Sequence, residues 1–432
     1  MAEVLGVALV GCGTVGTGVA RILRDHADRL TQRGGRAITL RHVVVRDAAK
    51  PRDEAVPAGL VGTSSDAAVT DPAVHVVVEL VGGTTVARGV ILAALAAGKH
   101  VVTANKALLA AHGPEIFEAA RKAERVVCFE AAVAGGVPII RALAESLAAN
   151  QVTALQGILN GTSNFILTAM ADRAVSYADA LAEAQRLGYA EADPTLDVDG
   201  SDAAHKLAVL AQIAFGVTAK SGDIEKVGID GVQAADIGFA RELGYTIKLL
   251  AEAWTDGPAV ALHVAPVLLR HTDMLAQVRG AHNAIQVTGD LVGETLYQGP
   301  GAGMMPTASS VVADILDLAV GRAQRTFAAA KLWSTAPRGY TLTPSEKVRS
   351  RFYLRLSVAD QPGVLADVCR MLAEQDISIA SVIQHEQTTG AAGVPLVIMT
   401  HAAETGRFRA AARRIGELPS VVEPPVYYSV AG

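Results

Sequence analysis

The run VLGVALVGCGTVG, from Val4 to Gly16, decides the fold class of this chain. Its first half is almost entirely apolar, which predicts a buried strand, and residues 18–30 follow with helical spacing. Between them lies a G-x-G-x-x-G pattern. Its glycines allow a tight turn and bring backbone N–H groups close to a pyrophosphate at the start of the helix. A glycine-rich loop without a ligand is the alternative, but the strand and helix are the context that the motif requires. The predicted dinucleotide-binding residues are Gly11, Gly13, Thr14, Val15 and Gly16.

Further apolar stretches continue the alternation of strand and helix, at residues 38–45, 74–81, 100–103 and 126–129. This order predicts a parallel sheet covered by helices, as in Rossmann-type domains. Such sheets bind ligands at the carboxyl ends of their strands. The polar residues that follow strand ends are therefore predicted to face a cofactor or substrate, and they are Thr84, Thr103 and Lys106. An ordinary surface lysine is the alternative for Lys106.

The residues after the strand at 38–45 bear on the choice of cofactor. An NAD site usually has an acidic residue here for the ribose hydroxyls. This chain has Arg46, followed by Asp47, with Lys50 and Arg52 nearby. Because a guanidinium can bind a phosphate through two hydrogen bonds, Arg46 favours NADP. Asp47 keeps NAD open, and the alternative for Arg46 is a solvent-facing loop residue.

The stretch LGYAEADPTLDVDGSDAAHKLAVL, from Leu187 to Leu210, is the chemical centre of the sequence. Its turn-forming residues argue against a helix before residue 201. Helical spacing begins there, with Ser201 or Asp202 as the predicted N-cap. Asp202 and Lys206 are four residues apart, so they share one face of this helix. The acidic residues of the stretch are Glu191, Asp193, Asp197, Asp199 and Asp202.

Two interpretations of this acidic stretch are open. It could be a solvated, calcium-type loop followed by a surface ion pair, since such pairs are common and weak. The EF-hand pattern is broken by Pro194 and by the missing terminal glutamate. Alternatively, the carboxylates bind an amine-bearing substrate, and Lys206 is the proton donor to a carbonyl.

Other loops carry weaker signals. Gly135 and Gly136 follow the strand at 126–129 in an irregular turn whose carbonyls could serve a hard cation such as sodium, although spacing alone does not establish this. The glycine run at 299–303 could close over a cofactor or form a plain hairpin turn. Residues 161–164 are predicted to be a loop, with a helix from Phe165.

Composition excludes several classes of protein. The chain has 432 residues and a formal net charge of −5, so nothing favours nucleic acid or an anionic membrane as a partner. Its three cysteines, Cys12, Cys128 and Cys369, suggest neither a disulfide framework nor a zinc cluster and fit a reducing cytoplasm. The N-terminus lacks the basic region of a signal peptide, and no apolar run is long enough to span a membrane.

The C-terminal part differs in composition from the rest. Residues 321–350 are less apolar and contain several prolines and glycines, so we expect a linker at 323–350. Beyond it, strand and helix patterns follow in the order βαββαβ of a ferredoxin-like unit. Such small domains often pair edge to edge and bind ligands at the seam; a simple dimerisation module is the alternative. We expect a homodimer or homotetramer.

With these pieces in place, nearly the whole sequence resembles the homoserine dehydrogenase family with a C-terminal ACT-type regulatory domain. The most specific motifs are GILNGTSNFIL at 157–167 and the acidic stretch at 187–210. GCGTVG, VVELVGG at 77–83, GKHVVTANKALL at 98–109 and PGAGMMPTASSVVAD at 300–314 support them. ADQPGVLADV at 359–368 is similar to the first loop and helix of ACT domains.

The resemblance implies an α/β fold with three domains. These are a Rossmann-type nucleotide-binding domain at 1–150 to which 304–322 return, an α+β catalytic and dimerisation domain at 151–303, and, after the linker, an ACT domain at 351–432. It implies NAD(P)-dependent interconversion of L-aspartate 4-semialdehyde and L-homoserine, in the biosynthesis of threonine, methionine and isoleucine. Feedback by an amino acid, most plausibly threonine, would act at the ACT domain.

The resemblance also implies roles for individual residues. Lys206 would be the acid/base, Asp202 would orient the substrate or the lysine, and Lys106 would lie between nicotinamide and substrate. Glu191 would bind the substrate ammonium group, with Asp197 as a further substrate-binding residue. Gly188 and Gly303 complete the predicted cofactor set. The family's sodium loop maps onto Glu130, Val133, Gly135 and Val137, where only the carbonyl of Val137 would matter.

Two other functions compete with this one. A phosphorylating semialdehyde dehydrogenase would use Cys128 as its nucleophile, but no histidine partner is evident. A non-enzymatic sensor of nucleotides and amino acids could be built from the same Rossmann and ACT parts. Such a sensor would not need the pair of Asp202 and Lys206.

Overall fold

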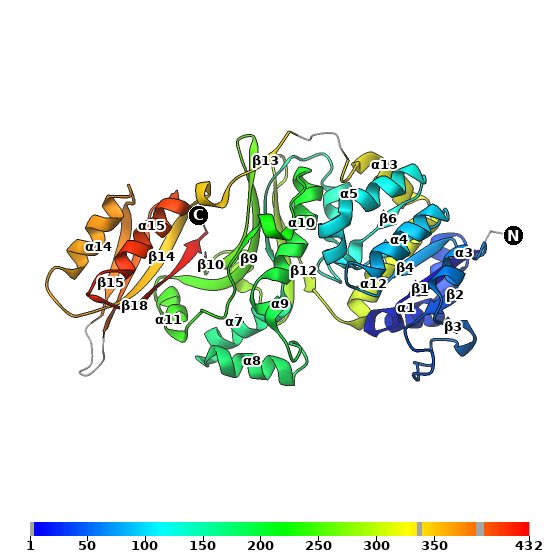
Figure 1. Cartoon of the computed structure of the whole chain (residues 1–432), viewed down its shortest axis with the longest axis horizontal. Helices are drawn as coiled ribbons and strands as arrows, with labels where there is room; N and C mark the ends of the chain where they lie inside the picture. The colour runs from blue at the N-terminus through cyan, green and yellow to red at the C-terminus, as the bar shows by residue number, and fades with distance from the viewer. Residues whose placement is uncertain (1–3, 335–338, 386–392, 432) are drawn as a thin grey trace. The chain divides into compact units, whose positions relative to one another are not determined.

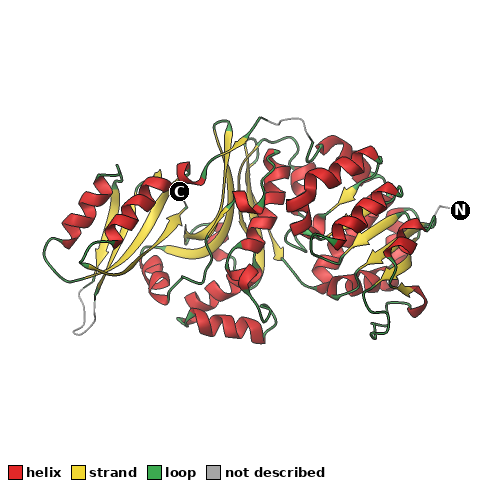
Figure 2. Cartoon of the chain, in the orientation of Figure 1, coloured by secondary structure: helices red, strands yellow, loops and turns green. Residues whose placement is uncertain are grey.

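The computed structural model describes residues 4–334, 339–385 and 393–431. The chain divides into two compact units. The first contains residues 1–155, 204–223 and 282–340, and the second contains residues 156–203, 224–281 and 341–432. Figures 1 and 2 show the helices and strands of each unit.

A parallel sheet forms the centre of the first unit. Its strand order is β3-β2-β1-β4-β5-β6, and every neighbouring pair is parallel. This is the order of dinucleotide-binding Rossmann domains, so the predicted nucleotide-binding fold is confirmed. The central strand is buried along its whole length, as expected for a sheet with helices on both faces. The strands are β1 (Leu5–Val10), β2 (Ile38–Val44), β3 (Val61–Gly62), β4 (Val76–Glu79), β5 (His100–Thr103) and β6 (Val127–Cys128).

Helices on this sheet differ in detail from the predicted ones. The helix expected at 18–30 is two helices that meet at His26, whose φ of −125° is not helical. The helix predicted after the glycine run returns to the sheet, since Ala308, Val311 and Ile315 share a core with β1. Residues 322–330, inside the segment predicted to be a linker, are helical. The helices are α1 (Thr14–Asp25), α2 (Ala27–Gly34), α3 (Ser65–Thr70), α4 (Val86–Ala96), α5 (Lys106–Lys122), α12 (Met304–Ala319) and α13 (Arg322–Ala330).

Shorter elements complete the part of the first unit that the structure describes. The hairpin of β11 (His282–Gly289) and β12 (Gly293–Pro300) leads into α12. Several short turns connect the larger elements. They are the 3-10 turns η1 (Ala58–Leu60) and η2 (Glu130–Ala132), the helix α6 (Ile139–Arg141), the π-helical turn η3 (Ala142–Ser146) and, in the segment 204–223, the 3-10 turn η4 (Ser221–Asp223).

The acidic stretch follows α8 in the sequence and contains α9 and the start of α10. The helix predicted from Phe165 begins earlier, at Gly161, because the Asn160 side chain caps it by accepting a hydrogen bond from the backbone N–H of Ser163. A one-turn helix also precedes Gly200, where no helix was expected. The elements here are α7 (Gly161–Arg173), α8 (Tyr177–Arg186), α9 (Thr195–Val198), β8 (Glu225–Lys226) and α11 (Ala234–Glu242). Residues of β7 (Val152–Ile158) and of α10 (Ser201–Phe215) are divided between the two units.

A largely antiparallel sheet runs through the second unit, in the order β9-β10-β18-β14-β16-β15. The C-terminal elements follow one another as βαββαβ, which confirms the predicted ferredoxin-like ACT fold. The last strand, β18, pairs in parallel with β10 at Val267 and Leu268. The elements are β9 (Tyr245–Asp256), β10 (Ala259–Arg270), η5 (Met274–Gln277), β13 (Thr341–Leu342), η6 (Ser345–Lys347), β14 (Arg349–Val358), α14 (Val364–Ala373), β15 (Ile379–Gln384), β16 (Val394–Thr400), β17 (Ala403–Glu404), α15 (Thr405–Gly416) and β18 (Val421–Val430).

The two faces of the ACT sheet pack against different elements. Alternate residues of β14, including Phe352, Leu354 and Leu356, pack in a core with the helices α14 and α15 (Figure 1). Because side chains alternate along a strand, Tyr353 and Arg355 lie on the opposite face. There they contact Asp236 on α11 rather than the ACT helices.

Within residues 4–334, 339–385 and 393–431, no single helix combines the length and apolar composition of a membrane span. The helices α12 and α13 meet these criteria only as a pair, which is bent by 93°.

Two helical glycines should respond in opposite ways to substitution by alanine. A Cβ on Gly18 would lie 2.9 Å from the Cβ of Ala308, so Gly18→Ala should separate α1 from α12 and lower the free energy of unfolding by about 1–3 kcal/mol. Gly89 on α4 is the control, because its Cβ would meet nothing within 4 Å. Gly89→Ala should stabilise the fold by ~0.5–1 kcal/mol. Urea denaturation measures both, and equal effects would contradict this packing.

Candidate active site

The glycine-rich loop between β1 and α1 has the shape that a dinucleotide needs. Gly11 has a φ of +98°, and a Cβ there would lie 2.6 Å from the backbone of Leu80. A Cβ on Gly16 would lie 2.5 Å from the carbonyl oxygen of Gly11. Gly13 is the N-cap of α1, and a Cβ there would meet no atom within 4 Å. The first and third glycines therefore close the turn, and the second leaves backbone free for a pyrophosphate at the helix start. The residues fit a dinucleotide cofactor.

A buried carboxylate organises the neighbouring strand ends. Glu79, at the end of β4, is fully buried and accepts hydrogen bonds from the backbone N–H groups of Val81 and Gly82, at 2.8 and 3.1 Å. It also accepts from the hydroxyl of Thr103, at 2.7 Å. Thr103 was predicted to face a cofactor or substrate. Because its side chain is buried and donates to Glu79, the role left for it is to hold Glu79.

Asn105 completes this arrangement and was not singled out from the sequence. Its side chain donates to the carbonyl of Gly83 at 2.7 Å and accepts from the N–H of Leu108 at 3.1 Å. It thus ties the 81–84 loop, which includes the half-buried Thr84, to the start of α5, where Lys106 is the first residue. An asparagine directly before a helical stretch is a capping signal that the sequence did contain.

The loop after β2 places Arg46 on the surface, where it is exposed. Arg52, rather than Arg46, holds the loop in place. It donates to the carbonyl oxygens of Cys12 and Asp47, at 2.9 and 2.8 Å. Arg52 therefore joins the glycine-rich loop to the end of β2 and leaves the exposed Arg46 side chain available to solvent or a ligand.

The acidic stretch separates into structural and convergent carboxylates. Asp193 accepts from the N–H and hydroxyl of Thr195, the first residue of the short helix α9. Asp199 accepts from the N–H and hydroxyl of Ser201, both at 2.7 Å, at the start of α10. Asp199 also pairs with Lys226 at 3.1 Å, and its pKa is held below the usual value although burial opposes this. The N-cap of α10 was predicted at Ser201 or Asp202. Both residues lie within the helix, so the helix begins earlier than predicted.

The other carboxylates of the stretch converge on one amide. The side-chain NH₂ of Asn160 donates to Asp197 at 2.8 Å and to Asp202 at 3.0 Å. Ser163, on the same helix start, donates its hydroxyl to the carbonyl of Asp197 at 2.7 Å. This brings together two of the predicted substrate residues, and it makes Asn160 a candidate site residue that the sequence did not single out.

Glu191 and the predicted glycines occupy the flanks of these loops. The side chain of Glu191 is exposed, and its carbonyl accepts from Gln185 at 3.2 Å. Gly188 ends α8 with a φ of +77°, where glycine is favoured for conformational reasons alone. Gly303, with a φ of +116°, begins α12 directly after the β11–β12 hairpin.

Both predicted catalytic lysines lie where solvent is restricted. Lys206 is 9 % exposed and stands one turn after Asp202 on α10. Lys106 is half-buried at the first turn of α5. Lysines are rarely buried to this degree unless they interact with other groups. The burial of Lys206 therefore favours a chemical role over that of a surface lysine.

The loop predicted to bind sodium is buried and irregular. Glu130 is 2 % exposed, and its carboxylate accepts from the N–H groups of Ile140 and Arg141, at 2.9 and 3.0 Å. The Gly135 carbonyl accepts from the Ser310 hydroxyl at 2.6 Å, and the Val137 carbonyl accepts from the Ile139 N–H at 2.8 Å. Each carbonyl oxygen has a second lone pair, so these groups remain suited to a hard cation. In the described part of the chain, no set of three His, Cys, Asp or Glu side chains is arranged to hold a metal.

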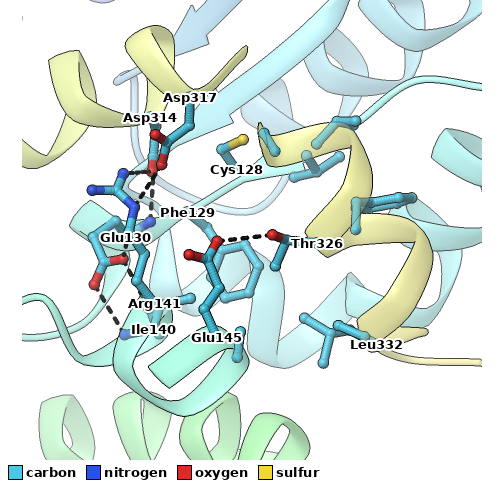
Figure 3. A pocket seen from close by; sticks show the side chains of 16 residues that line it. Cys128, Phe129, Glu130, Ile140, Arg141, Glu145, Asp314, Asp317, Thr326 and Leu332 are labelled. Atoms are coloured by element: carbon cyan, nitrogen blue, oxygen red, sulfur yellow. Dashed lines mark hydrogen bonds and ion pairs between the residues drawn. The ribbon is translucent and has the colours of Figure 1, made fainter. Parts of the chain in front are cut away.

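Next to this loop, β6, η3, α12 and α13 enclose a cavity of about 70 Å³ (Figure 3). Glu130, Arg141, Asp314 and Asp317 lie together on one side of it, and Thr326 and Leu332 lie on the other. Arg141 donates to Asp314 at 2.7 Å and approaches Asp317 at 2.7 Å. These contacts surround one guanidinium with carboxylates.

Cys128 also lines this cavity, and its chemistry bears on the competing function. Burial raises the pKa of the Cys128 thiol well above its usual value, and the nearby carboxylates of Asp314 and Asp317 act in the same direction. Since the thiolate is the nucleophile, a thiol in this environment is poorly suited to nucleophilic catalysis.

Comparisons with known proteins agree with this geometry. The sequence profile of the homoserine dehydrogenase NAD-binding domain matches residues 11–130, that of homoserine dehydrogenase matches 138–316, and that of the ACT domain matches 352–420. Homoserine dehydrogenases of Neisseria gonorrhoeae and Pseudomonas aeruginosa are 42% and 43% identical to this chain, over 97% of this chain and 97% of each relative. This chain belongs to the homoserine dehydrogenase family.

Solved structures extend this result to three dimensions. The homoserine dehydrogenase of Thiobacillus denitrificans has a TM-score of 0.92 and 43% identity, covering 99% of this chain and 98% of that chain. A hyperthermophilic archaeal homoserine dehydrogenase in complex with NADPH has a TM-score of 0.61 and 25% identity, covering 73% of this chain and 97% of that chain. As a homoserine dehydrogenase, this chain is an NAD(P)-dependent oxidoreductase that acts on a CH–OH group. Neither the phosphorylating dehydrogenase nor the sensor is favoured.

The pH dependence of stability should reveal the cluster around Arg141. Burial raises the pKa of Asp314 to about 7 from its usual 3.8, against the opposing charge of Arg141. A carboxyl group whose pKa is raised in the folded state stabilises the fold below its unfolded pKa, and this contribution is lost as pH rises through the folded pKa. Wild-type protein should therefore lose unfolding free energy relative to Asp314→Asn between about pH 4 and about pH 7.

Urea denaturation at several pH values measures this difference. The exposed Asp360, changed to Asn, is the matched control and should show no such trend. A constant difference between wild type and Asp314→Asn across the range would show that Asp314 is ionised throughout.

Proposed function

We propose that this homoserine dehydrogenase interconverts L-homoserine and L-aspartate 4-semialdehyde with NADP as its preferred cofactor. The proposal rests mainly on the convergence of Asp197 and Asp202 on Asn160 at the start of the helix that carries Lys206. Carboxylates held together suit an amino-acid substrate, whose ammonium group is a cation. The buried lysine on the same helix suits its carbonyl oxygen.

The proposed roles follow from the charges of the reaction. When bound, the cofactor would supply the hydride for the aldehyde carbon. Lys206 donates a proton to the oxygen on which negative charge develops, and it accepts that proton in the reverse direction. Lys106 stands between the nicotinamide and substrate sites as a second cation. Asp202 orients the substrate or Lys206, and Glu191 and Asp197 bind the substrate ammonium group.

The proposed cofactor site consists of the glycine-rich loop and the polar strand ends. The backbone of Gly11, Gly13, Thr14, Val15 and Gly16 binds the pyrophosphate at the start of α1. The exposed guanidinium of Arg46 binds the 2′-phosphate, which gives the preference for NADP. Thr84 contributes from the strand-end loops, and Thr103 acts by holding them through Glu79. Gly188 and Gly303 provide close backbone approach.

We include a sodium ion and regulation in the proposal. Glu130, Val133, Gly135 and Val137 would hold sodium through oxygen atoms of their buried loop, and the ion would fix that loop. The ACT domain would bind an amino-acid effector such as threonine. The exposed edge strand β15 would support a homodimer or homotetramer, since unpaired edges are ready to pair.

Lys206→Ala should lower kcat for homoserine oxidation by roughly two to four orders of magnitude, the usual contribution of a general acid/base. NADP binding, followed by fluorescence titration, should remain intact. Lys122→Ala, which changes an exposed lysine on α5, is the control and should keep wild-type kcat. Near-wild-type turnover of Lys206→Ala would remove this lysine from the mechanism.

Arg46→Ala should raise the Kd of NADP by about tenfold or more while changing that of NAD little, because only NADP carries the phosphate that the guanidinium binds. Titration of both cofactors measures the ratio. Arg33→Ala, on the exposed face of α2, should leave both values unchanged. Equal weakening of the two cofactors would show that Arg46 does not contact the 2′-phosphate.

A further inference from the structure

The short strand β8 presents its two side chains to different partners. Side chains of successive strand residues point to opposite faces. Glu225 pairs with Arg409 on the ACT helix α15. Lys226 pairs with Asp199 at 3.1 Å and donates a hydrogen bond to the Ser201 hydroxyl at the start of α10. Neighbouring residues thus join the ACT domain and the acidic stretch.

The backbone after β8 is fitted closely to the same stretch. The N–H of Ile229 donates to the carbonyl of Val198 at 2.8 Å. A Cβ on Gly228 would lie 2.4 Å from that carbonyl oxygen and 2.9 Å from the Cα of Asp199. No side chain can be accommodated at residue 228 without displacing the turn between α9 and α10.

The far end of the segment is held by the ACT sheet. Asp236, at 0 % exposure, accepts from the Arg355 Nε at 2.6 Å and from the Tyr353 hydroxyl at 3.1 Å. Arg355 also donates to the Gln233 side chain at 2.8 Å. The Tyr428 hydroxyl lies 3.4 Å from the carbonyl of Gly231. Residues 231–236 are therefore bound to the face of the ACT sheet that its own helices leave uncovered.

The two ends of this segment differ in strength. Separating the buried pair of Asp236 and Arg355 would leave a charge unpaired in the interior, which carries a large desolvation cost. Lys226 and Asp199 have side chains 38% and 35% exposed, so water can replace their contact at small cost. The backbone of β8 is also paired with β10 at His263 and Val264, so the side-chain contacts of Lys226 are the part of the segment that changes most easily.

We propose that residues 225–236 are a coupling segment in which Lys226 is a positioning residue for homoserine binding. Lys226 fixes Asp199 and Ser201, and through them the first turn of α10 with Asp202. The ACT domain fixes Lys226 through Glu225 and Asp236. The inference rests on the proposed role of Asp202 in substrate binding, and it assigns the route by which the ACT domain acts on that role.

The test compares Lys226→Met, Lys226→Arg, Glu225→Gln and the double variant Lys226→Met/Glu225→Gln in the full-length enzyme. Lys226→Met should raise the KM for homoserine by about two- to thirtyfold, the range of coupling effects from residues that do not touch a ligand. The KM for NADP should not change. Lys226→Arg should restore most of the loss, which a merely structural role would not predict.

The double variant decides the coupling. Glu225→Gln should raise the homoserine KM of the wild type but should add little in the Lys226→Met background. Arg414→Gln is the matched control, because it removes a half-exposed ACT ion pair with Glu374 away from the segment, and it should leave the homoserine KM unchanged. Glu225→Gln and Lys226→Arg keep the test decisive should Lys226→Met fold poorly.

Specific results would overturn the inference. A wild-type homoserine KM in Lys226→Met, or equal effects of Glu225→Gln in both backgrounds, would rule out the coupling segment. Asp202→Asn separates the two levels of the argument. If Asp202→Asn raises the homoserine KM while Lys226→Met does not, only the coupling fails. If neither changes it, the proposed substrate role of Asp202 fails as well.

Discussion

The shared amide of Asn160 is the contact on which the proposed chemistry depends. Asp197 and Asp202 come from different helices, and each carboxylate accepts from the same NH₂ group. Like charges brought together destabilise one another, and one neutral amide offsets this only in part. A cation between them relieves the repulsion. In the proposed function, the substrate ammonium group is the cation that these two carboxylates bind.

The remaining acids of the same stretch explain how this arrangement is held. Asp193 and Asp199 accept hydrogen bonds from the first residues of α9 and α10, and Asp199 also pairs with Lys226. The charge of Asp199 is thus compensated locally by Lys226, whereas Asp193 accepts hydrogen bonds from the neutral groups of Thr195. A stretch of similar acidic residues in the sequence becomes two groups in the fold, one that holds the turns and one that converges on Asn160.

The fold could be predicted from the sequence because apolar runs mark the strands of both sheets. Glycines mark turns whose backbone conformation other residues rarely adopt. The prediction failed at α7, α9 and α13, where local capping and tertiary packing set helix ends that composition obscures. It also missed Glu79, Asn105, Asn160 and Lys226. Each of these residues has a partner more than twenty residues away along the chain: Thr103 for Glu79, Gly83 for Asn105, Asp197 for Asn160 and Asp199 for Lys226. Local patterns contain no record of such pairings.

The ACT domain adds a constraint that a free-standing regulatory module would lack. Its β18 pairs with β10, and the buried Asp236–Arg355 pair joins α11 to β14 of the ACT sheet. A buried ion pair of this kind contributes more to a specific geometry than to stability, since well-packed apolar residues would stabilise the junction as well or better. Arg355 also donates to Gln233, and the Tyr428 hydroxyl lies near the carbonyl of Gly231. These contacts fix the position of the segment that follows β8. The junction therefore holds residues 231–236 in one position against the ACT sheet, as the proposed coupling segment requires.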